Sequence, residues 1–424
     1  MTRKFTNRGY LDLLKKRVAV FDGAMGTNLQ VQNLKPEHFG GEATFGCNDY
    51  LVITYPQAVE KVHRSFLEAG VDVIETCTFR SNRLTMKEYG LQNRILEINN
   101  AAASLARKCA DEFSTTGQSR FVAGSMGPTG KLPSMNDPEL SDITFDELVD
   151  IFREQAVGLI TGGVDLLLIE TSQDILEVKA AILGCQKAFE ETGVWLPIQA
   201  QVTLDTTGRM LLGTDINAVD TILEGLPIDV IGLNCSTGPD YMREPIQQLT
   251  EQTSLPVSCI PNAGLPLNID GQAVYPLKPE PFAEALTEFV TKFGVRVVGG
   301  CCGTTPEHLK HLVQSLNGKT PATRNVQTAP RLASSVSATP MQQEPAPFLI
   351  GERLNSQGSR KFKQVLLAED YDTMITIARE QIDSGAHGLD LCVSLTERTD
   401  EANMIHNIIK ALSPVVKAPF IFDS

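Results

Sequence analysis

The sequence predicts a (β/α)₈ barrel, followed by a linker and by the incomplete start of a second βα barrel. Eight short apolar runs alternate with helical patterns across residues 1–318, and most of these runs are continuous, as in buried parallel strands. Residues 319–347 then lose any apolar period, and strand-like runs resume at Phe348. A doubly wound open sheet is the structural alternative, but it usually has fewer strands.

The predicted strands of the first unit recur along the chain with helical segments between them. One such helix begins at Pro56 and ends at Gly70, with Val59, Val62 and Phe66 on one face. Eight βα units over this length are typical of a (β/α)₈ barrel. The predicted strands are Val18–Phe21, Val71–Glu75, Arg120–Ala123, Leu166–Glu170, Ile198–Thr203, Val230–Asn234, Pro256–Ile260 and Val295–Gly299.

The chain changes character twice after residue 318. Pro, Ser, Thr, Ala and Gln dominate residues 319–347, which indicates a linker. The segment after it has only three predicted strands and a helix over Tyr371–Gly385, and three strands cannot close a barrel. We therefore expect a barrel at 1–318, a linker at 319–347 and a truncated barrel at 348–424. The last three predicted strands are Phe348–Gly351, Gly388–Val393 and Pro419–Phe422.

The composition excludes several classes of partner and compartment. The formal net charge is −14 and no cluster of Lys and Arg forms a stripe or a tail, so neither nucleic acid nor an anionic membrane surface is an expected partner. Apolar runs such as Val164–Ile169 are too short to cross a bilayer, and the N-terminus has no secretory apolar region, so we expect a cytoplasmic protein. Nine scattered cysteines favour metal or redox chemistry over a disulfide framework.

Three cysteines follow predicted strands of the barrel and are the clearest sign of chemistry. Cys235 follows the sixth strand, and Cys301 and Cys302 follow the eighth, where flanking glycines permit an unusual backbone. Chemistry in such barrels belongs at the C-terminal ends of the strands. Three thiolates form a good zinc site with an open fourth position, typical of catalytic zinc. The alternatives are buried apolar cysteines, or a vicinal disulfide that ring strain and a reducing compartment oppose.

A three-thiolate zinc site with an open position suits a thiol substrate, because the metal ionises the thiol at neutral pH. Asp22 and Glu170 also end predicted strands, and we expect them to hold an α-ammonium group of that substrate. The alternative is that these carboxylates cap a helix or a backbone turn. Cys77 ends another strand, and we leave open whether it packs in the core or serves as an auxiliary ligand.

The motifs at these strand ends resemble those of the zinc-dependent homocysteine S-methyltransferase family. The resemblance covers residues 10–318, and it implies a (β/α)₈ barrel in which Cys235, Cys301 and Cys302 bind zinc and the homocysteine sulfur takes the fourth position. The motifs are DGAMGT (22–27), ETCTF (75–79), GSMGPTG (124–130), ETSQD (170–174), GLNCSTGP (232–239), PNAGLP (261–266) and GGCCGT (299–304).

The same resemblance implies roles for four further residues. Asp22 and Glu170 match the acidic residues that contact the amino group of homocysteine. Asn262 matches a position that can occupy the fourth zinc site before the substrate arrives. Cys77 stands where relatives usually have Asn, which leaves an extra thiol near the site.

The second segment begins with Gly-Glu-Arg-Leu-Asn at residues 351–355 and resembles the start of the pterin-binding barrel of the cobalamin-dependent methionine synthase family. The resemblance implies that Glu352, Asn355 and Asp423 face methyltetrahydrofolate. It also implies a reaction in which homocysteine takes a methyl group from methylcobalamin, ultimately from methyltetrahydrofolate, to give methionine. The sequence contains no cobalamin-binding domain, so a separate corrinoid protein or domain is an expected partner.

Two alternative functions remain open from the sequence. The first is the same thiol chemistry with a soluble sulfonium or betaine-type methyl donor. The second is a non-catalytic module that binds homocysteine or zinc. A screen of methyl donors would distinguish the first alternative from the cobalamin-dependent reaction. Tight binding of zinc and homocysteine without turnover of any donor would identify the second.

Overall fold

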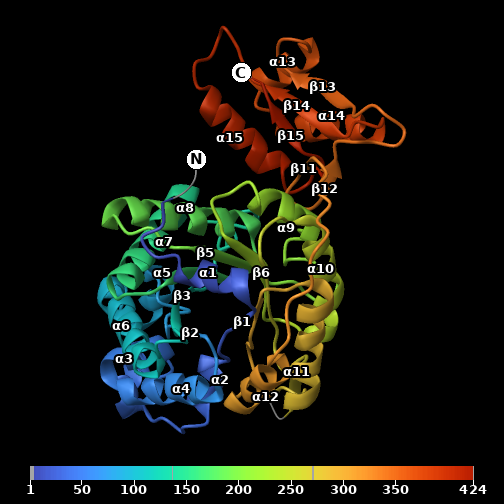
Figure 1. The fold of residues 1–424 in the computed structure, drawn as a ribbon. Helices are drawn as coiled ribbons and strands as arrows, with labels where there is room; N and C mark the ends of the chain where they lie inside the picture. The colour runs from blue at the N-terminus through green and yellow to red at the C-terminus, as the bar shows by residue number, and fades with distance from the viewer. Residues whose placement is uncertain (1–3, 136, 270–271, 424) are drawn as a thin grey trace.

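The first unit of the chain is a barrel of eight parallel strands, as predicted (Figure 1). The computed structural model describes residues 4–135, 137–269 and 272–423, so the ends and two short stretches of the predicted domain ranges lie outside it. A parallel bridge between Phe21 and Val73 joins the first and last strands of the sheet. In sheet order, the strands are β1 (Ala19–Val20), β10 (Val297–Val298), β7 (Val257–Ile260), β6 (Val230–Asn234), β5 (Ile198–Val202), β4 (Leu166–Ser172), β3 (Phe121–Met126) and β2 (Val73–Glu75).

Helices surround the barrel as an outer ring, and α1 (Gly9–Lys16) closes its N-terminal end (Figure 1). Tyr10 and Leu14 of α1 are buried against the inward-facing strand residues, and the Tyr10 hydroxyl donates to Gln199 Oε1 at 2.6 Å. The open end of the barrel is therefore the C-terminal one. The other helices of this unit are α2 (Met25–Gln30), α3 (Leu51–Thr54), α4 (Pro56–Ala69), α5 (Arg83–Met86), α6 (Ile95–Phe113), α7 (Phe145–Thr161), α8 (Ile175–Thr192), α9 (Ile216–Leu223), α10 (Pro239–Gln252), α11 (Pro279–Glu288) and α12 (Pro306–Leu316).

All eight predicted strands are present, but two of them extend further than predicted. β3 continues to Met126 and β4 to Ser172, so the first residues of the loops predicted after these strands belong to the strands themselves. Gly124 lies in the extended part of β3, where α7 packs directly on the strand. A side chain there would be too close to α7, because an added Cβ would lie 3.0 Å from the Leu159 side chain. A short hairpin of β8 (Leu267–Ile269) and β9 (Gln272–Val274) was not predicted.

The segment predicted as a linker packs against the barrel and contains a hairpin. Strands β11 (Arg331–Ala333) and β12 (Ala338–Pro340) pair antiparallel as a hairpin. Arg331 forms a buried ion pair with Asp220 of α9 at 2.6 Å, and the Asp215 N–H donates to the Val336 carbonyl at 2.9 Å. These contacts hold the hairpin between the barrel and the second unit (Figure 1).

The second unit has three parallel strands and a small core of its own. The middle strand is β14, with β13 and β15 on either side, and the helices pack against this sheet. None of the helices in the described ranges is long and apolar enough to cross a membrane. The elements are β13 (Ile350–Asn355), α13 (Arg360–Leu367), α14 (Tyr371–Asp383), β14 (Gly388–Cys392), α15 (Glu401–Leu412) and β15 (Phe420–Phe422).

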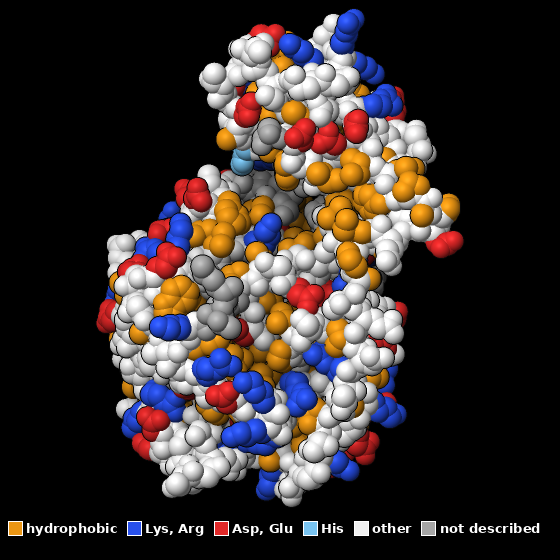
Figure 2. Space-filling model, turned by 45° about the horizontal axis from the view of Figure 1, so that its top comes forward, with side chains coloured by type: hydrophobic (Ala, Val, Ile, Leu, Met, Phe, Trp, Pro, Cys, Tyr) orange, Lys and Arg blue, Asp and Glu red, His pale blue; other side chains and the backbone are white. Residues whose placement is uncertain are grey.

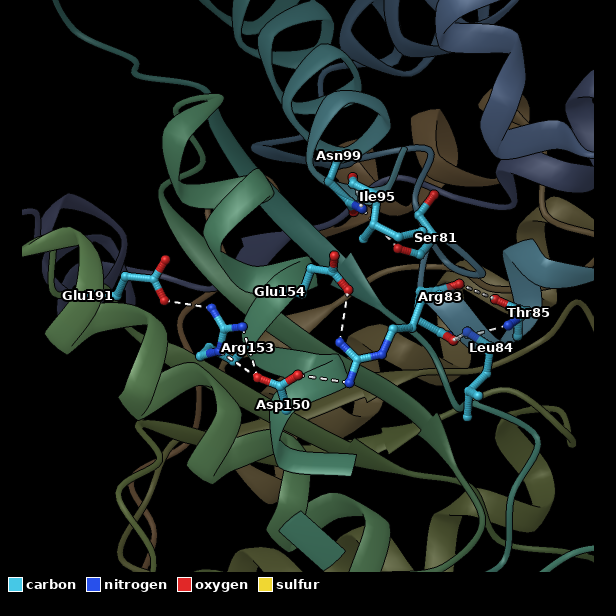
Figure 3. Close-up of polar contacts among 11 residues, drawn as sticks. Ser81, Arg83, Leu84, Thr85, Ile95, Asn99, Asp150, Arg153, Glu154 and Glu191 are labelled. Carbon is cyan, nitrogen blue, oxygen red and sulfur yellow. Dashed lines mark hydrogen bonds and ion pairs between the residues drawn. The ribbon is translucent and has the colours of Figure 1, made fainter. Parts of the chain in front are cut away.

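Ion pairs and a buried amide fix the segment that follows β2. Asn99 of α6 donates to the Ser81 carbonyl at 2.8 Å, and Arg83 of α5 contacts Asp150 and Glu154 of α7 (Figure 3). Arg153 forms ion pairs with Asp150 and with Glu191 of α8, so the network reaches a third helix. Contacts with α6 and α7 therefore fix the position of the segment that follows β2.

Two carboxylates at the start of α8 anchor the loop between β3 and α7. Asp174 accepts from the Ser134 N–H and hydroxyl at 2.8 and 2.6 Å. Glu177 accepts from the Thr129 N–H and hydroxyl at 2.8 and 2.5 Å, and its side chain is buried. Burial raises the pKa of Glu177 from 4.5 to about 7, against the lowering effect of the two hydrogen bonds.

Glu177→Gln should therefore change how stability depends on pH. Because the folded protein raises the pKa of this group, its contribution to stability is full below pH 4.5 and is lost as pH rises through about 7. The free energy of unfolding of the variant relative to wild type should rise by up to about 3 kcal/mol between about pH 5 and about pH 8, measured by urea unfolding. Glu190→Gln, an exposed position on the same helix, is the control. A constant difference across this range would contradict the assignment.

Candidate metal centre

A cavity of about 330 Å³ opens at the C-terminal end of the barrel. Its wall brings together all the sequence-predicted site residues of the first unit except Asn262. The strand ends supply its polar groups, because parallel strands all finish at this end. The predicted residues that line it are Asp22, Cys77, Glu170, Cys235, Cys301 and Cys302.

The sulfur atoms of Cys235, Cys301 and Cys302 all lie within 4.8 Å of one another. Cys235 follows β6 and the other two follow β10, with β7 between the two strands. The end of β7 fixes both turns: the Cys235 N–H donates to the Ile260 carbonyl at 3.1 Å and the Cys301 N–H to the Pro261 carbonyl at 2.8 Å. Three thiols distant in sequence therefore meet at one point.

The backbone around these thiols adopts conformations that few residues accept. Cys235 and Ser236 have φ values of 61° and 63°, in the left-handed region. Gly300 lies so close to Thr304 that an added Cβ would be 2.5 Å from its side chain, and the Thr304 hydroxyl donates to the Cys301 carbonyl at 2.6 Å. These turns aim the three side chains at one another.

The spacing of the sulfur atoms fits a zinc ion. Tetrahedral zinc with Zn–S bonds of about 2.3 Å places its sulfur ligands about 3.8 Å apart. Cys235 Sγ and Cys302 Sγ are separated by 3.9 Å. Hydrogen bonds from Cys235 and Cys301 lower the pKa of Cys302 to about 3, whereas hydrogen bonds with the other two thiols raise the pKa of Cys301 well above its ordinary value. The trio thus concentrates negative charge on one sulfur, which favours a cation.

Three carboxylates face the same cavity beside the thiols. Asp22 follows β1, Glu75 ends β2 and Glu170 lies in β4. Burial raises the pKa of all three, to about 7 for Glu170, and repulsion from Glu170 raises those of Asp22 and Glu75 further. Within the described residues, Asp22 Oδ1 is buried without a hydrogen-bond partner. A cationic group in the cavity would satisfy that oxygen and relieve the repulsion.

Glu170 is oriented through both of its oxygens. The Ser125 hydroxyl donates to Oε1 at 2.5 Å, and Asn234 Nδ2 donates to Oε2 at 3.1 Å. Asn234 also donates to Thr171 Oγ1 and accepts from the Thr171 N–H at 2.7 Å, which holds Thr171 at a φ of 58°. Since Asn234 directly precedes Cys235, one buried amide links the carboxylate to the cysteine cluster.

Asn262 and Cys77 lie beside the centre but make other contacts. Asn262 Oδ1 accepts from the Cys302 N–H at 3.0 Å, which ties this amide to the cysteine cluster. Cys77 Sγ contacts the Asn48 carbonyl at 3.5 Å and Asp49 Oδ1 at 3.9 Å. Cys77 lines the cavity but does not belong to the three-sulfur group of the described residues.

Sequence reasoning missed four residues of the site. Glu75 ends a strand, as Glu170 and Asp22 do, so the same argument could have found it. Ser125 and Asn234 act through hydrogen bonds to Glu170, and the only sequence signal was their place in strand-end motifs. The fourth is Tyr275, whose side chain lowers the pKa of the Cys302 thiol through a hydrogen bond, and whose ring packs on Gly303 so closely that an added Cβ would lie 2.2 Å from it.

The second unit places two of its three predicted residues at the C-terminal ends of β13 and β15, the strands on either side of β14. Asn355 ends β13, and its Nδ2 donates to Asp390 Oδ2 of β14 at 2.8 Å. Asp423 follows β15, and its N–H donates to the Leu391 carbonyl at 3.1 Å. Glu352 is an exposed residue of β13, nearer the middle of that strand.

Comparison with known proteins agrees with this architecture. In solved structures, the chain resembles the homocysteine methyltransferase MmuM from Escherichia coli in its metallated form (TM-score 0.57, 21% identity, 71% of this chain and 97% of that one). The oxidized form of that protein gives a TM-score of 0.59 at 21% identity, over 73% of this chain and 99% of the other. At this identity the likeness concerns the fold alone.

Sequence relatives are closer. The chain is 41% identical to the methionine synthase of Mycobacterium tuberculosis over 414 residues, and to that of Mycobacterium leprae over 419 residues. Each match covers 98% of this chain but 34% of the relative, so the chain spans about a third of their length. A pterin binding enzyme profile matches residues 351–424, and a homocysteine S-methyltransferase profile matches residues 19–316. Because the latter covers well over half of the chain, the protein belongs to the homocysteine S-methyltransferase family.

Proposed function

We propose that the barrel binds zinc through Cys235, Cys301 and Cys302 and uses it to activate the thiol of homocysteine for methyl transfer. The observation that carries this proposal is the meeting of three sulfur atoms, within 4.8 Å of one another, beside buried carboxylates in one cavity. When bound, zinc lowers the pKa of a thiol ligand and leaves its fourth position for the substrate. A site of this kind suits a reducing compartment such as the cytoplasm, because oxidation would join its thiols.

The protein's own side chains then bind and orient the amino acid. Asp22 and Glu170 accept hydrogen bonds from the α-ammonium group, and Glu75 adds a third carboxyl group to the same wall. Ser125 and Asn234 hold Glu170 in place. Because the cationic end is fixed on this wall, the thiol end is directed toward the three cysteines. Asn262 is the candidate to fill the fourth position in the absence of substrate.

The methyl donor that we propose is methylcobalamin, carried by a separate corrinoid protein or domain. The homocysteine thiol loses its proton to solvent, and its sulfur forms a bond to the methyl carbon. The cobalt–carbon bond breaks with both electrons left on cobalt, which gives methionine and cob(I)alamin. The 41% identity to methionine synthases supports this donor, while a soluble sulfonium or betaine-type donor is the alternative.

For the second unit we propose a part of a pterin site. The profile match over residues 351–424 supports this, as do Asn355 and Asp423 at the C-terminal ends of the two outer strands of one parallel sheet. Glu352, Asn355 and Asp423 would face methyltetrahydrofolate. Three strands cannot enclose such a ligand, so the site needs further strands to bind it.

Zinc content is expected to depend on the cluster cysteines and not on Cys77. Purified protein should hold about one zinc per chain, and Cys302→Ser should lower zinc affinity by about a hundredfold or more because it removes one of three protein ligands. Cys77→Ser is the matched control, since it removes a thiol from the same cavity. Competition with a chromogenic chelator measures both. Loss of zinc in Cys77→Ser alone, or in neither variant, would rule out the proposed cluster.

Glu170→Gln should weaken homocysteine binding by about tenfold or more, because it removes the charge that faces the ammonium group. The comparison ligand is 4-mercaptobutanoate, which has the thiol and the carboxylate but no amino group. Its affinity should stay within about twofold of wild type. Calorimetric titration of the zinc-loaded protein measures both ligands. An equal loss for both would mean that Glu170 acts on the cysteine cluster rather than on the amino group.

Methyl transfer is tested by mixing zinc-loaded protein with homocysteine and free methylcobalamin and following the corrinoid spectrum. We expect demethylation faster than in buffer, and methionine formed in equal amount. Cys302→Ser should abolish the acceleration. Acceleration only with a sulfonium or betaine donor would replace the cobalamin proposal, and tight binding without turnover by any donor would make the chain a non-catalytic module.

A further inference from the structure

A second cavity, of about 520 Å³, lies at the opposite end of the barrel from the cysteines. Its wall is formed by α1, by the segments that enter β6, β7 and β10, and by residues 322–326 after α12. This volume falls within the range of about 300–1,000 Å³ that small-molecule pockets occupy. The C-terminal cavity described above does not extend here, because α1 closes the barrel between them.

Four cationic side chains line this second cavity although the chain is strongly acidic overall. Within the described part of the chain they are Arg8, directly before α1, Lys15 of α1, Arg296 before β10, and Arg324. Lysine and arginine side chains also gather on the face of the barrel that is turned to the viewer in Figure 2. Asp12 is within 3.8 Å of Arg8 and 3.1 Å of Lys15, so those two cations already have a partner.

Arg296 and Arg324 are different, because among the described residues their guanidinium groups donate only to backbone carbonyls. Arg296 Nη1 donates to the Leu14 carbonyl at 3.2 Å, and Arg324 Nη2 donates to the Leu255 carbonyl at 2.8 Å. Arg324 Nη1 is buried and has no hydrogen-bond partner among the described residues. Neither group has a carboxylate within 4.0 Å in the described part of the chain. A buried guanidinium donor left unsatisfied in this way calls for an acceptor.

The two guanidinium groups also repel each other. Burial, together with the positive charge of Arg296, lowers the pKa of Arg324. The carboxylate of the wall, Asp229, accepts from the Ile198 N–H at 2.9 Å. An oxyanion between the arginines would accept from the free Nη1 and offset the repulsion, since guanidinium groups match carboxylate and phosphate geometry.

We propose that this cavity binds a small organic oxyanion, with its carboxylate or phosphate group between Arg296 and Arg324. The apolar part of the ligand lies against Leu11, Leu255 and Val326, which supply the non-polar wall. The site is independent of the cysteine centre and of the proposed methyl transfer. Its ligand joins α1 to the segment after α12, and binding therefore stabilises the folded barrel.

Calorimetric titration of the full chain with phenyl phosphate, benzoate, inorganic phosphate and neutral phenol tests the proposal. Phenyl phosphate or benzoate should bind, and the tighter of the two identifies the preferred anionic group. Phenol should not bind, and inorganic phosphate should bind more weakly than phenyl phosphate because it leaves the apolar wall unfilled. Equal affinity for inorganic and phenyl phosphate would overturn the assignment of that wall, and no binding by any oxyanion would overturn the site.

Substitution of the two arginines tests whether the probe binds in this cavity. Arg324→Met and Arg296→Met should each weaken binding of the better probe by about tenfold or more, since each removes a charge-assisted donor. Arg296→Met serves as the second variant if Arg324→Met disturbs the packing of residues 322–326. Arg379→Met, at an exposed position of the second unit, should bind like wild type. Unchanged affinity in both cavity variants would place the ligand elsewhere and contradict the proposal.

Discussion

Parallel strand pairing around a closed barrel is the constraint on which every feature of the site depends. Because all eight strands finish at the same end, β6 and β10 bring Cys235 within 3.9 Å of Cys302, although 67 residues separate them in sequence. The same rule gathers the carboxylates that end β1, β2 and β4 around that cluster. The strands fix the positions of the chemical groups, and the loops need only aim them.

The two ends of the barrel collect opposite charges. The C-terminal cavity holds three thiols and three carboxyl groups; burial disfavours the charged form of the carboxyl groups, and a bound cation would restore it. The N-terminal cavity holds Arg296 and Arg324 without a carboxylate partner among the described residues, and it therefore needs an anion. Unsatisfied charges of both kinds lower the stability of the ligand-free fold. Ligands that supply the missing charges would therefore stabilise the folded state.

Much of the fold could be predicted from the sequence because its signals are local. Continuous apolar runs marked all eight barrel strands, and Gly70 marked the end of α4, where it adopts a φ of 100°. The cysteine trio could be predicted because strand order determines which strand ends are neighbours. The roles of the predicted metal, substrate and pterin residues stay predictions until the ligands are bound.

What could not be predicted depends on pairs of side chains that are distant in sequence. The linker packs against the barrel through the ion pair of Arg331 with Asp220, 111 residues away, whereas its composition indicates only a linker. Asn234 became a site residue through hydrogen bonds to Glu170, which no spacing rule reveals. The basic cavity combines Arg8 and Lys15, near the start of the chain, with Arg296 and Arg324, which come much later in the sequence, so no single stretch of the chain signals it.

X-ray absorption at the zinc edge, recorded with and without homocysteine, tests the central claim most directly. The account predicts three sulfur ligands and one lighter ligand in the zinc-loaded protein, and four sulfur ligands once homocysteine is added. A protein that takes up no zinc, or a zinc ion whose sulfur count does not change when homocysteine binds, would contradict it.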